Sequence, residues 1–169
     1  AKKFEARRPE LSDSGFQDTD YVLTTREFIR MIKEAGIDFA NIPEEEPDEG
    51  MSFYSGAGTI FGATGGVMEA AIRSAYTLVT GEELENIDIV GVRGLDGVKE
   101  ATIPIPGFGD LRVAVAHGLS NARKVMDRVR EGLATTGESP WHFIEIMACP
   151  GGCVGGGGKP FGNKIADRA

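Results

Sequence analysis

The sequence predicts an α/β protein in which an open, parallel or mixed sheet is flanked by helices. A strand, helix, strand pattern runs from Leu111 to Met147, and this order of elements builds parallel sheets. Two further segments, 25–35 and 67–80, carry apolar residues at helical spacing. The length of 169 residues suits one sizeable core, so we expect residues 1–169 to form a single domain.

The first predicted helix has clear start and stop signals. Thr24 stands three residues before Glu27, which is the capping-box arrangement, and Gly36 follows the last apolar position. The β-prone residues 21–23 come directly before it and predict a short strand, after an opening of polar loop. The acidic, proline-containing stretch 41–50 predicts a surface loop, because its like charges repel and no ligand pattern interleaves with them.

The second predicted helix follows a cluster of glycines at 55–66. Glu69 and Arg73 are spaced for an ion pair along this helix, and Gly81 is expected to end it. A glycine-rich loop that enters a helix is a general anion site, since free backbone N–H groups and the helix dipole both favour negative charge. The cluster is therefore a candidate binding loop.

Nucleotide binding finds no support in the glycine motifs. In the first cluster, Phe61 stands where the dinucleotide fingerprint requires its third glycine. In the later cluster, Cys153 stands at the first glycine of a P-loop, and Pro160 replaces the Ser or Thr that would hold magnesium. Both nucleotide motifs fail.

The remaining elements are predicted from alternating and helical patterns. They are strands at 87–92, 101–105 and 111–116, a helix at 120–131 that ends at Gly132, and a strand at 143–147. Functional loops gather at the carboxyl ends of parallel strands. The loop after residue 147 is therefore the expected position of a site.

Composition excludes several classes of protein. The formal net charge is −8 and the isoelectric point about 4.8, so neither nucleic acid nor an anionic membrane surface is expected as a partner. No apolar run approaches the roughly 20 residues of a spanning helix. Two cysteines do not make a secreted disulfide scaffold, which favours a reducing, cytoplasmic location. The sequence starts with Ala1 and not with an initiator Met, so we expect it to be truncated at the N-terminus. A periplasmic location therefore stays open.

The loop MACPGGC at 147–153 holds both cysteines of the chain. Cys149 and Cys153 could be inert thiols, a disulfide, half of a zinc site or part of an iron-sulfur site. Zinc needs four ligands, and the remaining candidates, His117 and His142, are expected to be structural. The surrounding glycines favour the iron-sulfur interpretation, because inert thiols usually lie inside strands or helices.

These motifs together resemble the catalytic large-subunit domain of [FeFe]-hydrogenases. The resemblance rests on MACPGGC with the glycines that follow it, and on SGAGTIFGATGGVMEAA at 55–71. Residues 1–6 are similar to the stretch directly after another cluster cysteine of that family, and residues 143–145 lead into the last motif as expected. The resemblance covers essentially the whole chain and implies one lobe of that domain, truncated at the N-terminus and expected to be truncated at the C-terminus.

The resemblance implies reversible oxidation of dihydrogen to protons and electrons. The centre of that family is a [4Fe-4S] cluster bridged to a di-iron unit with CO, cyanide and amine dithiolate ligands, the H-cluster. By position, Cys149 ligates the cubane, and Cys153 ligates the cubane and bridges to the di-iron unit. Lys2 matches the family lysine that hydrogen-bonds a cyanide, so Lys2 and Cys153 are the catalytic candidates. Met147 and Phe61 match residues that pack beside the di-iron unit.

The chain also departs from that family. The family supplies four cubane cysteines and this chain has two, so the other motifs are expected upstream of Ala1, and Lys159 stands where glutamine is usual. The fragment alone is expected to be inactive. The implied partners are the remainder of the hydrogenase polypeptide, ferredoxin or another electron carrier, an NAD-linked acceptor, maturation proteins, dihydrogen and protons.

Two rival functions stay open at this point. One is a non-catalytic iron-sulfur assembly or sensor protein of the same fold, which would keep cubane ligands without a working di-iron site. Lys2, Phe61 and Met147 speak against it, since the resemblance assigns them to that di-iron unit. The other is a metal-free interaction domain in which Cys149 and Cys153 are reduced and idle.

Overall fold

The computed structural model describes residues 2–11, 15–17, 19–46, 55–84 and 97–161. These residues belong to two compact units. The first unit, here the N-terminal unit, comprises Ala1–Glu46 and Gly158–Phe161; the second, here the sheet unit, comprises Pro47–Gly157 and Gly162–Ala169. Each unit is described by itself, and the single lobe over 1–169 stays a prediction.

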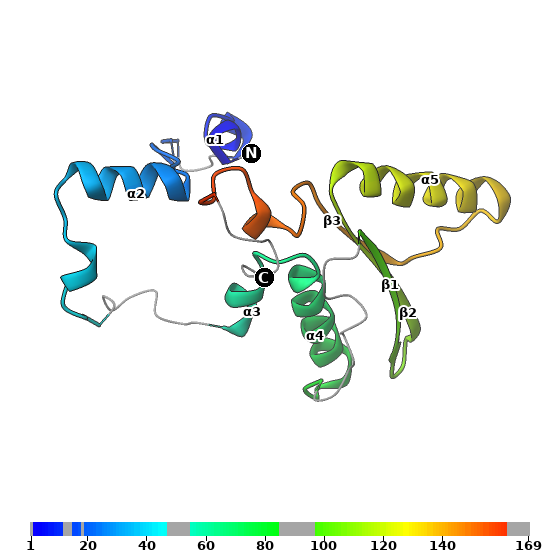
Figure 1. Cartoon of the computed structure of the whole chain (residues 1–169). Helices are drawn as coiled ribbons and strands as arrows, with labels where there is room; N and C mark the ends of the chain where they lie inside the picture. The colour runs from blue at the N-terminus through cyan, green and yellow to red at the C-terminus, as the bar shows by residue number, and fades with distance from the viewer. Residues whose placement is uncertain (1, 12–14, 18, 47–54, 85–96, 162–169) are drawn as a thin grey trace. The chain divides into compact units, whose positions relative to one another are not determined.

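Among the described residues, the sheet unit is built on a three-stranded mixed sheet (Figure 1). Its strands are β1 (Val98–Ile105), β2 (Gly109–His117) and β3 (Phe143–Met147), in the order β1-β2-β3. β1 and β2 form an antiparallel hairpin, whereas β2 and β3 run parallel. The predicted α/β class with a mixed sheet and flanking helices is confirmed. The strand predicted at 87–92 lies outside the described residues.

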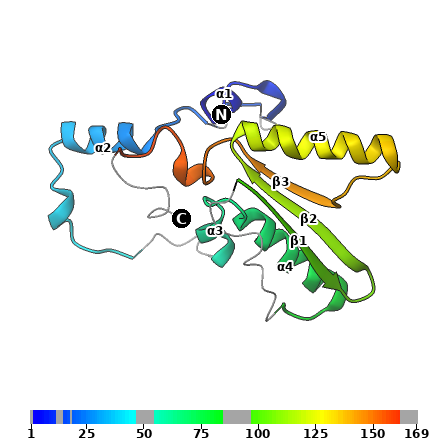
Figure 2. The ribbon, with the colours of Figure 1, turned by 45° about the vertical axis from the view of Figure 1, so that its right-hand side comes forward.

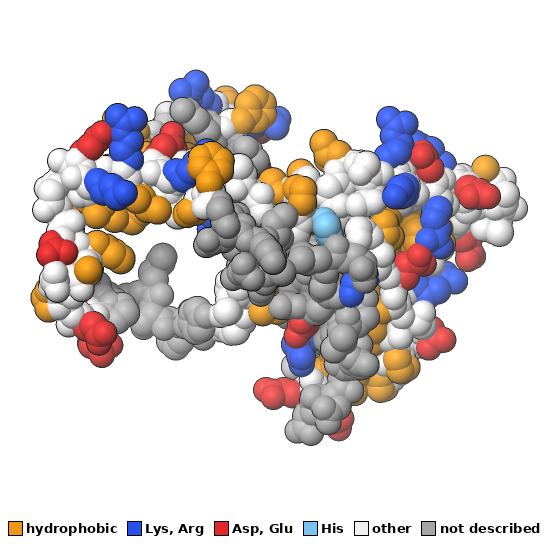
Figure 3. All heavy atoms as spheres, in the orientation of Figure 1, with side chains coloured by type: hydrophobic (Ala, Val, Ile, Leu, Met, Phe, Trp, Pro, Cys, Tyr) orange, Lys and Arg blue, Asp and Glu red, His pale blue; other side chains and the backbone are white. Residues whose placement is uncertain are grey.

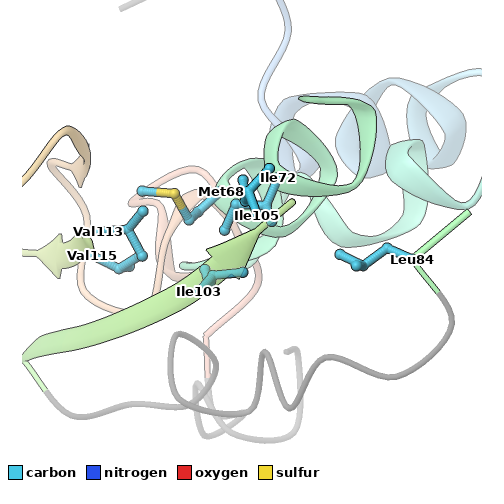
Figure 4. Packing of buried hydrophobic residues seen from close by; sticks show 7 residues of the cluster. All are labelled: Met68, Ile72, Leu84, Ile103, Ile105, Val113 and Val115. Carbon is cyan, nitrogen blue, oxygen red and sulfur yellow. The ribbon is translucent and has the colours of Figure 1, made fainter. Parts of the chain in front are cut away.

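Helices cover both faces of this sheet, as Figure 2 shows. On one face, α4 (Gly66–Thr80) places Met68 and Ile72 against Val113 and Val115 of β2. Figure 4 shows these side chains together with Ile103 and Ile105 of β1 and Leu84, which complete the cluster. Burial of this apolar surface is the main stabilising term for the unit.

The opposite face of the sheet is covered by α5 (Leu119–Thr135). Val125 of this helix and Trp141 pack with Ala114 and Ala116 of β2. All four consecutive residues of β2 from 113 to 116 are buried, since side chains of a strand alternate between its two faces and here both faces are covered.

The ends of the helices show which glycine predictions hold. Gly81 has a left-handed φ of +74° and closes α4 as expected, and the Glu69–Arg73 ion pair forms at 3.1 Å. The predicted end at Gly132 is wrong, because α5 continues to Thr135. Gly132 instead allows close packing, since a Cβ there would lie 2.7 Å from the Glu138 oxygen.

The N-terminal unit contains α1 (Lys2–Glu5), α2 (Thr25–Glu34) and two short 3-10 turns, η1 (Pro9–Leu11) and η2 (Phe39–Asn41). The helical turns α1 and η1 correct the expectation of a plain loop at the start. Residues 21–23 form no strand among the described residues, so that prediction is wrong. Tyr21 is 87% exposed, and its β propensity has no neighbouring strand to pair with.

The α2 capping box is confirmed. The Thr24 N–H donates to Glu27 Oε2 at 2.7 Å, and the Glu27 N–H donates to Thr24 Oγ1 at 3.2 Å. The apolar residues at helical spacing form no buried face, however: α2 has no buried residue, and Phe28 and Met31 are about half exposed. Figure 3 shows apolar side chains at the surface of this unit.

Candidate functional site

The cysteine loop, residues 148–157, continues directly from β3. It is folded by its own backbone: the Gly152 N–H donates to the Cys149 oxygen, and the Gly156 N–H donates to the Cys153 oxygen, both at 3.0 Å. A 3-10 turn, η4, spans Cys153–Gly155. Both thiols are free; Cys149 is half-buried and Cys153 is exposed. The loop therefore leaves two thiols accessible for ligation.

The glycine loop, residues 61–65, pairs with the cysteine loop. It follows α3 (Gly56–Ile60) and leads into α4. The Thr64 N–H donates to the Gly151 oxygen and the Val154 N–H donates to the Gly62 oxygen, both at 3.0 Å. The two glycine-rich segments that the sequence separates by about 80 positions thus form one structure.

Gly152 shows why this pairing requires glycine. Its φ is +98°, a left-handed value that other residues avoid. A Cβ at this position would lie 2.7 Å from the Thr64 nitrogen, 2.8 Å from the Gly62 oxygen and 2.8 Å from Met147 Sδ. In the structure, Gly152 lets the two loops approach each other.

Hydrogen bonds join the end of β2 to the cysteine loop and to the end of β3. The Gly151 N–H donates to His117 Nδ1 at 3.0 Å, and the Gly118 N–H donates to the Met147 oxygen at 2.8 Å. His142 Nδ1 likewise accepts from the Arg112 N–H at 3.0 Å. Both histidines take part in structural hydrogen bonds, as expected. No group of three or more His, Cys, Asp or Glu side chains suited to a metal occurs in the part of the chain that the structure describes.

Glu145 is a residue that sequence reasoning missed. It lies in β3 and is only 8% exposed. Its Oε1 accepts from the Gly65 N–H and its Oε2 accepts from the Met68 N–H, both at 2.7 Å. The feature of the sequence that could have identified Glu145 is that it is a single carboxylate at an inward position of the strand FIEIM. A buried charge needs hydrogen-bond partners, so such a residue is expected to bind another element.

The structure brings four of the five predicted site residues to the paired loops. Cys149 and Cys153 lie in the cysteine loop, and Met147 precedes it with Sδ next to Gly152. Phe61 caps the end of α3 at the start of the glycine loop and is 46% exposed. Lys2 lies in the N-terminal unit, and its side chain lies outside the described residues. The roles of all five stay predictions.

The chemistry of these residues fits half of an iron-sulfur ligand set. Thiolates are the usual ligands of such clusters, which take four, and the chain contains two cysteines. Thr64 also offers a polar group: its hydroxyl is buried and has no hydrogen-bond partner among the described residues. A complete [4Fe-4S] ligand set would need thiolates from beyond these 169 residues.

Comparison with known proteins gives consistent relatives. The family model "Iron only hydrogenase large subunit, C-terminal domain" matches residues 1–157. The chain is 55% identical over 160 residues to the periplasmic [Fe] hydrogenase large subunit of Nitratidesulfovibrio vulgaris, covering 95% of this chain and 37% of that protein. It is 52% identical over 163 residues to iron hydrogenase 1 of Clostridium pasteurianum, covering 96% and 27%.

A more distant relative belongs to another functional class. The chain is 33% identical over 166 residues to cytosolic iron-sulfur assembly component 3 of Pongo abelii, covering 94% of this chain and 33% of that protein. The chain thus spans well under half the length of each of these curated relatives. Their names include both periplasmic and cytosolic proteins, and the cytoplasmic location stays a prediction. None of the described helices is long and apolar enough to cross a membrane.

Solved structures agree with these relatives. The [FeFe]-hydrogenase HydA(deltaEFG) matches with a TM-score of 0.74 at 40% identity, over 99% of this chain and 48% of that chain. [FeFe]-hydrogenase HydA1 from Chlamydomonas reinhardtii matches with a TM-score of 0.73 at 39% identity, over 99% and 49%. The sequence and the fold lead to one conclusion: the chain belongs to the iron-only hydrogenase large subunit, C-terminal domain family.

Proposed function

We propose that this sequence is part of a hydrogenase, here called the parent protein, that reversibly oxidises dihydrogen to protons and electrons. The observation that carries this proposal is the pair of free thiols in the cysteine loop, at the carboxyl end of β3. It occurs in a chain that is 55% identical to a periplasmic [Fe] hydrogenase large subunit. Cys149 and Cys153 would supply two thiolates to the H-cluster, a [4Fe-4S] cluster bridged to a di-iron unit.

The bound H-cluster would supply the metal that activates dihydrogen and the store for its electrons. The chain's own residues would hold and shield it. Cys149 and Cys153 bind as thiolates, and the Thr64 hydroxyl is available as an outer hydrogen-bond donor. Met147 and Phe61 offer apolar surface that excludes water from the centre. Lys2 would place an ammonium where it offsets the charge of a cyanide ligand.

The proposed partners follow from this chemistry. The remainder of the parent polypeptide would supply the other cluster ligands, since the chain covers 37% of one hydrogenase relative and 27% of another. A ferredoxin or another electron carrier, or an NAD-linked acceptor, would exchange electrons with the cluster. Maturation proteins would install the di-iron unit with its CO, cyanide and amine dithiolate ligands.

A second candidate function is that of an iron-sulfur assembly or sensor protein without hydrogenase activity. The 33% identity to cytosolic iron-sulfur assembly component 3 favours it. The higher identities of 55% and 52% to hydrogenases favour the first proposal, as does the presence of Lys2, Phe61 and Met147.

The two candidates are separated by maturing the parent protein with the di-iron unit. Dihydrogen oxidation is measured with a viologen dye, and infrared spectra are recorded for iron-bound CO and cyanide. The hydrogenase proposal expects both activity and the infrared bands. Bound iron and sulfide with neither signal would contradict it and support the assembly or sensor function. A parent protein that binds no iron would leave the idle-thiol interpretation.

A further inference from the structure

Glu145 lies on the same face of β3 as Met147, the residue that leads into the cysteine loop. In the parallel register, Glu145 pairs with Val115 and Met147 pairs with His117. Val115 belongs to the core under α4, so this row of side chains faces α4. The carboxylate therefore lies between the strand that carries the cysteine loop and the helix that follows the glycine loop.

The two carboxylate oxygens of Glu145 are divided between the glycine loop and α4. Oε1 accepts from the Gly65 N–H and Oε2 accepts from the Met68 N–H. Gly65 is the N-cap of α4, has a left-handed φ of +85° and provides no side-chain cap. A carboxylate at a helix N-terminus satisfies free N–H groups and complements the helix dipole. Glu145 thus replaces the missing cap from another element.

The glycine loop is bound at its other side to the cysteine loop. Thr64, directly before Gly65, donates to the Gly151 oxygen, and Gly62 accepts from the Val154 N–H. Thr64, Gly65 and Gly151 are all buried. Strand β3 continues into the cysteine loop, the cysteine loop is hydrogen-bonded to the glycine loop, and the glycine loop is hydrogen-bonded to Glu145 of β3. The three segments therefore form a closed ring.

We infer that Glu145 is a positioning residue of the proposed cluster site, which keeps the glycine loop in register with the cysteine loop. The inference rests on the proposed function. Loss of the Glu145 bonds would release the glycine loop, and with it the two hydrogen bonds from that loop to the segment between Cys149 and Val154. The thiols would then lose their fixed geometry toward the cluster. If Glu145 were only a cap of α4, it would stabilise the helix, and its loss would leave the geometry of the thiols unchanged.

The test compares Glu145→Gln with Glu100→Gln in the parent protein. Gln keeps the size of the side chain, but its NH₂ group opposes one of the two N–H donors. Glu100 offers a matched control, because it also loses charge-assisted bonds on this substitution: it accepts from Arg128 of α5 and from Trp141 Nε1. Arg128 lies in α5 and Trp141 packs with Val125 of that helix, and neither residue takes part in the hydrogen bonds described above between the two loops.

Two measurements are made on each variant. The first is amide hydrogen exchange of segments 61–68 and 150–157 in protein purified without cluster, which requires no activity. The second is the electron paramagnetic resonance spectrum of the reduced cubane in protein loaded with that cluster alone. We expect Glu145→Gln to raise exchange at least about tenfold in both segments and to shift or broaden the cubane spectrum. Glu100→Gln should leave both measurements unchanged.

Faster exchange confined to 65–68, with 150–157 and the cubane spectrum unchanged, would overturn the inference and leave Glu145 a helix cap. If Glu145→Gln does not fold, Glu145→Asp, which keeps the charge on a shorter side chain, is measured against the same control with the same criteria. A wild-type parent protein that binds no cluster would contradict the proposed function. The exchange comparison would still decide whether Glu145 couples the two loops.

Discussion

Helices α2 and α4 begin in opposite ways. α2 is capped by its own neighbours, since Thr24 and Glu27 exchange hydrogen bonds across three residues. α4 has no such side-chain cap, and the N–H groups of Gly65 and Met68 donate to Glu145, which lies 80 and 77 residues further along the chain. The bonds of the local cap join residues of one helix, whereas the distant cap joins α4 to strand β3, which carries the cysteine loop. The second arrangement occurs at the candidate site.

Removing the distant cap should have the largest effect on stability. Glu145→Ala deletes both acceptors and leaves the Gly65 and Met68 N–H groups buried without partners. We expect it to lower the free energy of unfolding by about 3 kcal/mol. Urea denaturation of the parent protein measures this change. A loss no greater than that of Thr24→Ala would contradict the distinction between the two caps.

Breaking the contact between the loops is the next test. Gly152→Ala introduces a Cβ that would lie 2.7 Å from the Thr64 nitrogen, at a φ of +98°. We expect a loss of about 2 kcal/mol and a lower iron content after cluster loading. Gly157→Ala is the matched control in the same loop, because nothing lies within 4 Å of its Cβ position. Equal iron contents in the two variants would show that the close approach is not needed.

Removing the local cap should have a smaller effect on stability. Thr24→Ala loses the side-chain acceptor of the capping box, which typically costs about 1 kcal/mol. We expect urea denaturation to report this loss while the cubane spectrum stays as in the wild type. A changed cubane spectrum would mean that α2 is also coupled to the thiols, and the contrast between the two helices would fail.

Glu100→Gln, which removes the charge of an exposed carboxylate, should have the smallest effect on stability. This effect should be visible mainly in how stability depends on pH. Hydrogen bonding from Arg128 lowers the pKa of Glu100 below its ordinary value of 4.5. A lowered pKa in the folded state contributes stability above pH 4.5, and this contribution is lost as the pH falls through the folded value. The stability difference between wild type and Glu100→Gln should therefore shrink below about pH 4.5. A difference that grows on acidification would contradict this ion pair.

Local patterns in the sequence predicted most of the fold. Strand β3 has the predicted bounds, and the capping box of α2 and the closing Gly81 of α4 form as expected. These features depend on residues within a few positions of one another. The prediction for 21–23 was wrong because a strand needs a partner, and Gly132 did not end α5 because its role is packing against residues beyond the helix.

The candidate site was predicted only in part. The cysteine spacing and the glycine clusters identified both loops, but no pattern in the sequence indicated that the loops pair with each other. The hydrogen bonds of Glu145 and the contact of Gly152 with Thr64 join residues about 80 positions apart. Such contacts depend on how the sheet and α4 pack. Local propensity contains no information about them, and neither contact could be read from single motifs.

The most direct test of the central claim is the iron and sulfide content of the anaerobically purified parent protein and its Cys149→Ala and Cys153→Ala variants. Gly157→Ala serves as the control from the same loop. The proposed function predicts a [4Fe-4S] cluster in the wild type and the control, and a large loss of iron and sulfide in both cysteine variants, because each removes one thiolate ligand. Iron and sulfide contents that stay unchanged in both cysteine variants would contradict the claim that this loop binds the cluster.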